Sequence, residues 1–197
     1  METSAARKGR PRSEKSRKAI LLATNRLLLQ TSVQELSIES IAKKAKVGKT
    51  TIYRWWPNKT AVVMDALASQ PGVQTPLPTA TSHREAIVMQ LDKLIRLVDS
   101  NNGQTIAQLF SEAQGSEISL GIFKDNLLEP LMDAIRYSIE EGQKTGEFRK
   151  NIDAAMAVDI LCGPIFFRLM AHPKDLDENF RKTFPQQAMH VIDLKAA

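Results

Sequence analysis

Apolar residues recur with the period of an α-helix along most of this chain. Between residues 37 and 45 they occupy positions 38, 41, 42 and 45, which form one face of a helix, and Ser37 is suited to cap its N-terminus. Beyond residue 82 the same period predicts helices over 82–99, 104–114, 121–143, 153–171 and 176–194. No stretch shows the persuasive alternation of a β-strand, so we expect an all-α protein.

A turn and a second short helix follow the helix at 37–45. Residues 46–48 interrupt the pattern, and we expect Gly48 to make the sharp turn because it lacks a β-carbon. On the next helix Ile52 and Trp56 share one side, which is expected to pack. The opposite side carries Thr50, Thr51, Arg54 and Trp55. This helix-turn-helix pattern predicts a second helix that is free to contact DNA.

Proline and glycine divide the chain further. Pro57 disfavours helical geometry at the residue before it, and Asn58 can cap a new helix. Three prolines and a glycine within 71–81 break that helix and indicate a hinge. With 197 residues and 43% apolar content, the chain can build a small helical domain followed by a larger one.

Basic charge is concentrated at the N-terminus. Residues 1–60 hold 14 Lys and Arg against 4 Asp and Glu, a net of +10, whereas residues 61–197 hold 13 against 18, a net of −5. A local excess suits a module that neutralises phosphate. The arm at 1–12, with Arg7, Lys8, Arg10 and Arg12, is too polar to fold alone. It is either an arm that enters the minor groove of DNA or a solubilising tail.

The N-terminal third resembles the TetR family of bacterial transcription regulators in the stretch LSIESIAKKAKVGKTTIYRWWPNKTAVVMDAL, residues 36–67. The segments EPLMDAIRYSIEEGQKTGEFR and DILCGPIFFRLM also look like the regulatory domain of one TetR subgroup. The resemblance implies a basic arm at 1–12, a three-helix helix-turn-helix DNA-binding domain at 13–70 and a hinge at 71–81. It implies a helical bundle for ligand binding and dimerisation at 82–197.

The resemblance also implies which residues meet double-stranded operator DNA. Base edges and backbone of the major groove are expected at Thr50, Thr51, Arg54 and Trp55, and phosphates at Lys49, Tyr53 and Lys59; Ser37 completes the set. Arg54 is the best candidate for base specificity, because Arg pairs bidentately with guanine. Lys59 lies in the first turn of a helix, where a bound phosphate would favour a cation. Trp55 either contacts DNA or covers a partly buried edge of the domain.

A small-molecule effector is expected in the C-terminal domain. Pro130 and Pro164 lie inside helical patterns and predict kinks that leave space between helices. An apolar or aromatic ligand would suit the candidate walls, although the same residues could be plain core. The candidates are Met89, Ile106, Phe110, Phe123, Leu127, Met132 and Phe166.

A homodimer is expected through the last two helices, because TetR-like proteins pair these helices into a four-helix bundle. Gly163 and Ala157 could permit close helix approach. Apolar side chains cover more than one face of these helices: Phe166, Phe167, Met170, Phe180, Phe184, Met189 and Ile192. Two recognition helices spaced about one DNA turn (~34 Å) can read a near-palindromic site.

Catalysis, a metal site and a cofactor are not indicated, since the three histidines are scattered. A buried structural thiol is the preferred interpretation of the single cysteine, Cys162, over a redox sensor. No apolar run approaches membrane-spanning length and no hydrophobic signal region opens the chain, so we expect a cytoplasmic protein without a membrane partner.

The function predicted from the sequence is therefore a homodimeric repressor that a small ligand releases from its operator. Three alternatives remain open. The first is an architectural or cell-cycle DNA-binding protein without an inducer, and the second is a transcriptional activator. The third, a helical enzyme or ligand carrier, would need clustered acid-base or metal groups.

Overall fold

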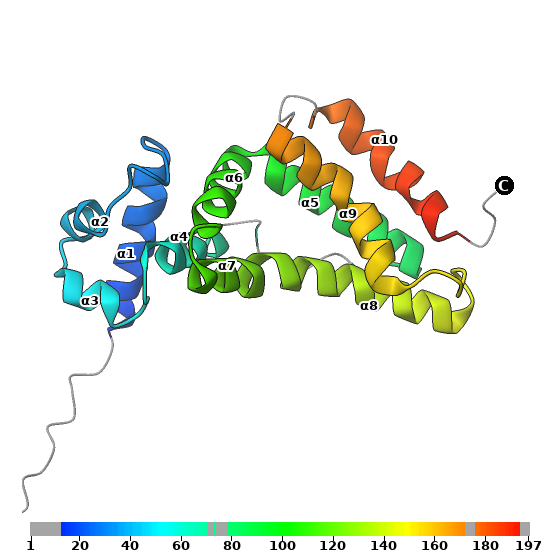
Figure 1. Ribbon diagram of the computed structural model, residues 1–197, viewed down its shortest axis with the longest axis horizontal. Helices are drawn as coiled ribbons and strands as arrows, with labels where there is room; N and C mark the ends of the chain where they lie inside the picture. Colours follow the sequence, from blue (N-terminus) through cyan, green and yellow to red (C-terminus); the bar gives the residue numbers. More distant parts are fainter. Residues whose placement is uncertain (1–12, 71–72, 74–78, 172–175, 194–197) are drawn as a thin grey trace, which may run out of the picture.

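The computed structural model describes residues 13–70, 73, 79–171 and 176–193. Within these ranges the regular structure is helical, apart from one isolated antiparallel bridge between Phe148 and Asp193. The expected all-α class is therefore confirmed. The basic arm at 1–12 and most of the expected hinge lie outside the described residues. Figure 1 shows the first helices at one end of an elongated molecule and the later helices forming the remainder.

Four helices form the N-terminal part: α1 (Glu14–Leu28), α2 (Ile38–Ala45), α3 (Lys49–Tyr53) and α4 (Lys59–Ala68). Side-chain caps explain where three of them begin, because Ser13, Ser37 and Asn58 each accept a hydrogen bond from a backbone N–H three residues later. Helix α1 packs against α2 and α4. Their shared core is fully buried and includes Ile20, Ile41, Ile52 and Val62.

The C-terminal part consists of α5 (His83–Asp99), α6 (Asn101–Ala113), α7 (Glu117–Phe123), α8 (Glu129–Thr145), α9 (Ala154–Ala171) and α10 (Glu178–Ala188). A π-helical segment, Lys124–Leu128, joins α7 to α8, and a 3-10 turn, Met189–Val191, follows α10. Helix α5 packs against α8, α9 and α10, so it is the central helix of this layer. Helices α6 and α7 lie beside α4 and connect the two parts (Figure 1).

The helix predicted over 121–143 is present in a continuous helical stretch from Glu117 to Thr145, but it is not uniform. The structure ends α7 at Phe123, inserts the π-helical segment, and places Pro130 in the first turn of α8. The helix runs on from the π-helical segment into α8, so Pro130 interrupts a continuing helix, and the π turn directly before it is a local adjustment to the missing N–H. Pro164 does lie inside α9, as the pattern predicted. The last helix is shorter than the predicted 176–194, because α10 ends at Ala188 and gives way to the 3-10 turn.

Helix α9 also corrects the expectation about membrane-spanning length. Its 18 residues have a mean hydropathy of 1.7, enough by length and composition alone to cross a membrane, and 33% of them are buried. The helix packs against α5, α6 and α8 on one side. Its opposite side is apolar and exposed at Met156, Ile160, Phe167 and Met170.

The residues expected to face a second copy divide into three groups by their burial. Met189 and Ile192 are fully buried and Phe180 is nearly so, and all three belong to the chain's own core. Phe166 and Phe184 are partly buried against that core. Phe167 and Met170 are exposed on α9. The seven side chains therefore do cover more than one face: those of α10 pack on the chain's own core against α5, whereas Phe167 and Met170 of α9 lie outside it.

Candidate nucleic-acid interface

The interface begins at α2, whose first turn is held by two serines. Ser37 Oγ accepts from the Ser40 N–H at 3.1 Å, and Ser40 Oγ accepts from the Ser37 N–H at 3.2 Å. This reciprocal capping box satisfies two backbone donors that the helix itself leaves unpaired. The cap fixes the start of α2 and leaves Ser37 half-buried at that end.

The turn between α2 and α3 is made by Lys46, and the expectation for Gly48 is wrong. Lys46 has φ 56° and ψ 45°, the left-handed conformation that commonly ends a helix. The N–H of the next residue, Val47, bonds back to the Ala42 carbonyl at 3.0 Å. Gly48 has φ −75° and ψ 149°, extended angles that any residue adopts, and it occupies the N-cap of α3. The chain reverses two residues earlier than the glycine suggested.

Helix α3 is anchored by the side that the sequence predicted. Ile52 is fully buried and Trp56 is 6% exposed. The indole N–H of Trp56 donates to Asp65 Oδ2 at 3.0 Å. Arg17 Nη2 donates to both oxygens of the same carboxylate, at 2.8 and 2.6 Å. Asp65 therefore links α1, α4 and the end of residues 49–56, which we call the recognition segment.

The other side of α3 faces outward. Lys49, Thr50, Tyr53 and Arg54 are exposed, and Thr51 is half-buried. Lys49 Nζ lies 2.8 Å from Glu39 Oε1 of α2, with both side chains more than half exposed. The hydrogen bond from Lys49 lowers the pKa of Glu39, and the same bond raises the pKa of Lys49. Both groups stay charged at neutral pH, so a loosely held ammonium lies at the start of α3.

Trp55 covers an edge of the N-terminal core. It is half-buried, packs against that core and lies with its ring centroid 6.1 Å from that of Trp56. The Arg17 guanidinium lies 5.8 Å from the Trp55 ring centroid, within the range of a cation–π contact. This packing agrees with the interpretation that Trp55 covers a partly buried edge of the domain. Contact between Trp55 and DNA stays a prediction.

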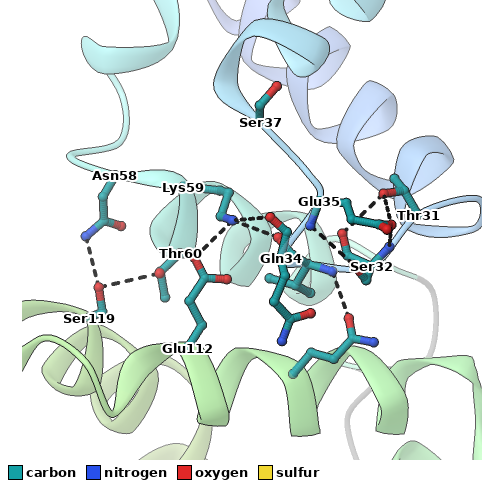
Figure 2. Close-up of polar contacts among 12 residues, drawn as sticks. Thr31, Ser32, Gln34, Glu35, Ser37, Asn58, Lys59, Thr60, Glu112 and Ser119 are labelled. Carbon is teal, nitrogen blue, oxygen red and sulfur yellow. Dashed lines mark hydrogen bonds and ion pairs between the residues drawn. The ribbon is translucent and has the colours of Figure 1, made fainter.

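Lys59 points toward the C-terminal part rather than outward (Figure 2). Its ammonium donates to the Val33 carbonyl at 2.7 Å and lies 2.9 Å from Glu112 Oε1 on α6. The Lys59 side chain is 20% exposed. The DNA-binding candidates on α3 therefore lie together, whereas the Lys59 side chain points into a separate cluster. Contact between Lys59 and a DNA phosphate remains a prediction.

This cluster joins the two parts of the molecule. Gln108 Oε1 on α6 accepts from the Val33 N–H at 2.7 Å. Ser119 Oγ on α7 lies 3.5 Å from both Asn58 Nδ2 and Thr60 Oγ1 at the start of α4 (Figure 2). We call Val33, Lys59, Gln108, Glu112 and Ser119 the junction cluster.

Six of the seven candidate ligand walls lie in the core of the C-terminal part or pack against it, and Met89 is the exception. Ile106, Phe123 and Leu127 are buried, and Phe110 packs on Phe123 with ring centroids 5.6 Å apart. Met89, Met132 and Phe166 are half-buried. A cavity of about 360 Å³ lies instead beside the junction cluster, between residues 28–35 and α6. Its polar lining differs from the expected apolar wall, and ligand contact by the seven candidates stays a prediction.

Sequence reasoning missed the partners that hold the interface in place. Arg17 and Asp65 are 48 residues apart, and Lys59 and Glu112 are 53 residues apart. Helical periodicity carries no information on such pairs, because it relates only residues within a few turns. The one available signal was charge: Asp65 is an acidic residue in the otherwise apolar pattern of α4.

Both parts of the chain match known protein families. Residues 20–73 match the model for bacterial regulatory proteins of the tetR family, and residues 77–185 match the tetracyclin repressor-like C-terminal domain. YdeS of Bacillus subtilis strain 168, an uncharacterized HTH-type transcriptional regulator, is 32% identical over 192 residues, covering 98% of this chain and 97% of YdeS.

Solved structures share the fold at lower identity. A TetR family transcription regulator superposes with a TM-score of 0.68 at 23% identity, covering 88% of this chain and 96% of its own. A transcriptional regulator from Saccharomonospora viridis in complex with choline gives a TM-score of 0.67 at 20% identity, covering 93% and 100%. The helical arrangement therefore recurs among regulators whose sequences have diverged widely.

Proposed function

Because this chain belongs to the TetR family of bacterial transcription regulators, we propose that it is a homodimeric repressor that a small molecule releases from its operator. The family and the relatives are DNA-binding transcription regulators and not enzymes. The proposal adds the sign of regulation, the dimer, the effector and a cytoplasmic location.

The presentation of α3 is the observation that carries the proposal. Ile52 and Trp56 fix one side of this helix in the core, and Thr50, Tyr53 and Arg54 remain exposed on the other. A rigidly held helix with donors on its open side is suited to the major groove, where Arg and Thr side chains reach base edges. The positive charge of Lys49, loosely paired with Glu39, adds affinity for phosphate.

Dimerisation is supported by the exposed stripe on α9. Met156, Ile160, Gly163, Phe167 and Met170 follow one another at alternating spacings of four and three residues, the period of a helix–helix seam. Phe167 is 63% exposed and Met156 is 55% exposed. A second copy would remove this apolar stripe from water. Gly163, in the middle, would allow two α9 helices to cross closely about a two-fold axis.

A small-molecule effector is supported by a polar pair inside the C-terminal layer. Gln90 Nε2 on α5 donates to Ser138 Oγ on α8 at 3.2 Å, whereas Gln90 Oε1 is buried and has no partner among the described residues. A buried acceptor without a donor is unfavourable, and a ligand that brings a donor would satisfy it. The choline complex of the Saccharomonospora viridis regulator supports the capacity of this fold to hold a small molecule.

A DNA-binding regulator without an inducer is the second candidate. The close packing of Phe110 against Phe123 favours it, because these two candidate wall residues fill space that a ligand would need. A thermal-shift screen against apolar and aromatic compounds separates the two candidates. A compound that raises the melting temperature and also weakens operator binding supports the effector.

The proposal is tested by selecting bound sequences from a random duplex pool at near-physiological salt, followed by the stoichiometry of the complex. An enriched inverted repeat bound by a dimer supports a specific regulator. Repeating the selection with Arg54→Ala should relax the preference at one base position of each half-site. Binding without enrichment, which disappears as salt rises, would leave only phosphate affinity and contradict the proposal.

A further inference from the structure

The ammonium of Lys59 is fully engaged within the protein. It donates to the Val33 carbonyl at 2.7 Å, pairs with Glu112 Oε1 at 2.9 Å and lies 3.5 Å from the Gln34 carbonyl. An ammonium has three donors, and these three oxygens account for them. Lys59 can therefore bind a DNA phosphate only by giving up one of these partners.

Lys59 has three oxygen partners, whereas Glu112 has a single ion-pair partner among the described residues, which is Lys59. The Glu112 side chain is 30% exposed, and its second oxygen, Oε2, is buried without a partner among the described residues. Lys59 supplies the only ion pair that the described residues give this carboxylate. Removing Lys59 would leave a partly desolvated charge uncompensated, which is unfavourable.

We propose that Glu112 of the C-terminal part restrains DNA binding by holding Lys59 in the junction cluster. Operator phosphate and Glu112 compete for one ammonium, so binding at the operator weakens the contact between α4 and α6. By linkage, any ligand that strengthens the Lys59–Glu112 pair lowers operator affinity. The inference rests on the proposed function, because it assigns Lys59 to an operator phosphate, and it names a residue that regulates that site.

The other contacts of the junction cluster can persist when the Lys59–Glu112 pair breaks. Gln108 accepts from the Val33 N–H at 2.7 Å, and Ser119 lies 3.5 Å from Asn58 and Thr60. These contacts join α6 and α7 to the N-terminal part without using the Lys59 ammonium (Figure 2). Loss of the ion pair alone therefore leaves the two parts in contact, so the effect on DNA can be measured in a folded protein.

The test is a double-mutant cycle on the operator duplex recovered by selection, with Glu112→Gln, Lys59→Met and the double variant. Glu112→Gln keeps the shape of the side chain and removes its charge. We expect it to bind the operator roughly 3–10-fold more tightly than the parent, the range for releasing a partly exposed ion pair. Lys59→Met should weaken binding and lower the slope of log affinity against log salt by about 0.9, one phosphate contact.

The cycle separates competition from the general effect of removing a negative charge. In the Lys59→Met background, Glu112→Gln should no longer tighten binding. Glu117→Gln, an exposed acidic residue in the first turn of α7, is the matched control and should leave operator affinity nearly unchanged. Thermal unfolding of each variant checks that the fold is intact.

Three results would overturn the inference. Weaker operator binding by Glu112→Gln would mean that the ion pair holds the protein in its DNA-binding arrangement. Unchanged binding would mean that the pair has no influence. Equal tightening in the presence and absence of Lys59 would mean that charge alone acts. Failure of the parent protein to select any operator is a different outcome, and it would contradict the proposed function itself.

Discussion

Trp56 and Asp65 are joined by a hydrogen bond of 3.0 Å from the indole N–H to Oδ2 of the carboxylate. Arg17 Nη2 donates to both oxygens of the same carboxylate, so three segments of the N-terminal part meet at one side chain. The aromatic ring of Trp56 is buried, and its polar edge is the part that meets Asp65. The relationship fixes the end of the recognition segment in position relative to α1 and α4.

Asp65→Asn should lower the free energy of unfolding by about 1 kcal/mol, because it removes a partly exposed charge-assisted pair with Arg17. The amide can still accept from Trp56, so the packing of the ring should persist. Urea denaturation measures the change. The matched control is Asp92→Asn, which breaks the exposed pair between Asp92 and Arg96 on α5 and should cost less than about 0.5 kcal/mol. Equal losses in the two variants would contradict the linking role of Asp65.

The turn before α3 predicts a gain of stability at Lys46 and almost no change at Gly48. Lys46→Gly should raise the free energy of unfolding by about 0.5–1 kcal/mol, because glycine adopts φ 56° without strain. Gly48→Ala should change it by less than about 0.5 kcal/mol, since a β-carbon there would meet only Thr50 Oγ1, at 3.6 Å. Chemical denaturation of both variants checks the pair. A large loss of stability in Gly48→Ala would mean that the turn depends on Gly48 and not on Lys46.

The sequence predicted most reliably those features that depend on neighbouring residues. Ser37 and Asn58 cap α2 and α4 as expected, because a cap is a contact over three residues. The buried side of α3 followed from the spacing of Ile52 and Trp56. The residue that makes the turn was predicted wrongly, because a left-handed residue at a helix end is usually glycine and here is Lys46.

Features set by tertiary packing could not be read in the same way. The π-helical segment Lys124–Leu128 lies inside an apolar pattern that is equally consistent with a straight helix. The direction of Lys59 depends on Glu112, which the fold brings within 2.9 Å from a distant part of the chain. Likewise, periodicity gave Phe167 and Met189 the same apolar signal, and only packing exposes the first and buries the second.

The proposed dimer predicts that Phe167→Glu yields a monomer, because a charge in the middle of the α9 stripe would have to be desolvated at the interface. Sedimentation equilibrium measures the mass. Tyr137→Glu is the matched control, because Tyr137 is 65% exposed on α8, close to the 63% of Phe167. The control should retain the mass of the parent, whereas a dimeric Phe167→Glu variant would move the interface away from α9. The monomer should also lose preference for an inverted repeat while keeping weak phosphate binding.

Cys162 predicts a loss of stability at alkaline pH. Burial, with a smaller contribution from Asp159, raises the pKa of this thiol from 9.0 to about 12. A raised pKa in the folded state means that the unfolded chain loses its proton first, so stability is complete below pH 9 and falls as pH rises toward 12. Urea denaturation is measured between about pH 8 and 10, on either side of the pKa of an unfolded thiol. The free energy of unfolding should fall more steeply with rising pH for the parent than for Cys162→Ala. Parallel declines would contradict the burial of the thiol.

Two helical glycines in the C-terminal part should respond to alanine in opposite directions. A β-carbon at Gly142 would overlap the ring of Phe148, which is 1% exposed and has little room to move. Gly142→Ala should therefore lower the free energy of unfolding by about 1–3 kcal/mol, the usual cost of overpacking. A β-carbon at Gly121 on α7 would meet nothing within 4 Å, so Gly121→Ala should raise stability by about 0.5–1 kcal/mol through helix propensity. Thermal and urea unfolding measure the stability of each variant against the parent. A gain of stability in Gly142→Ala would show that α8 does not pack on Phe148 as closely as described.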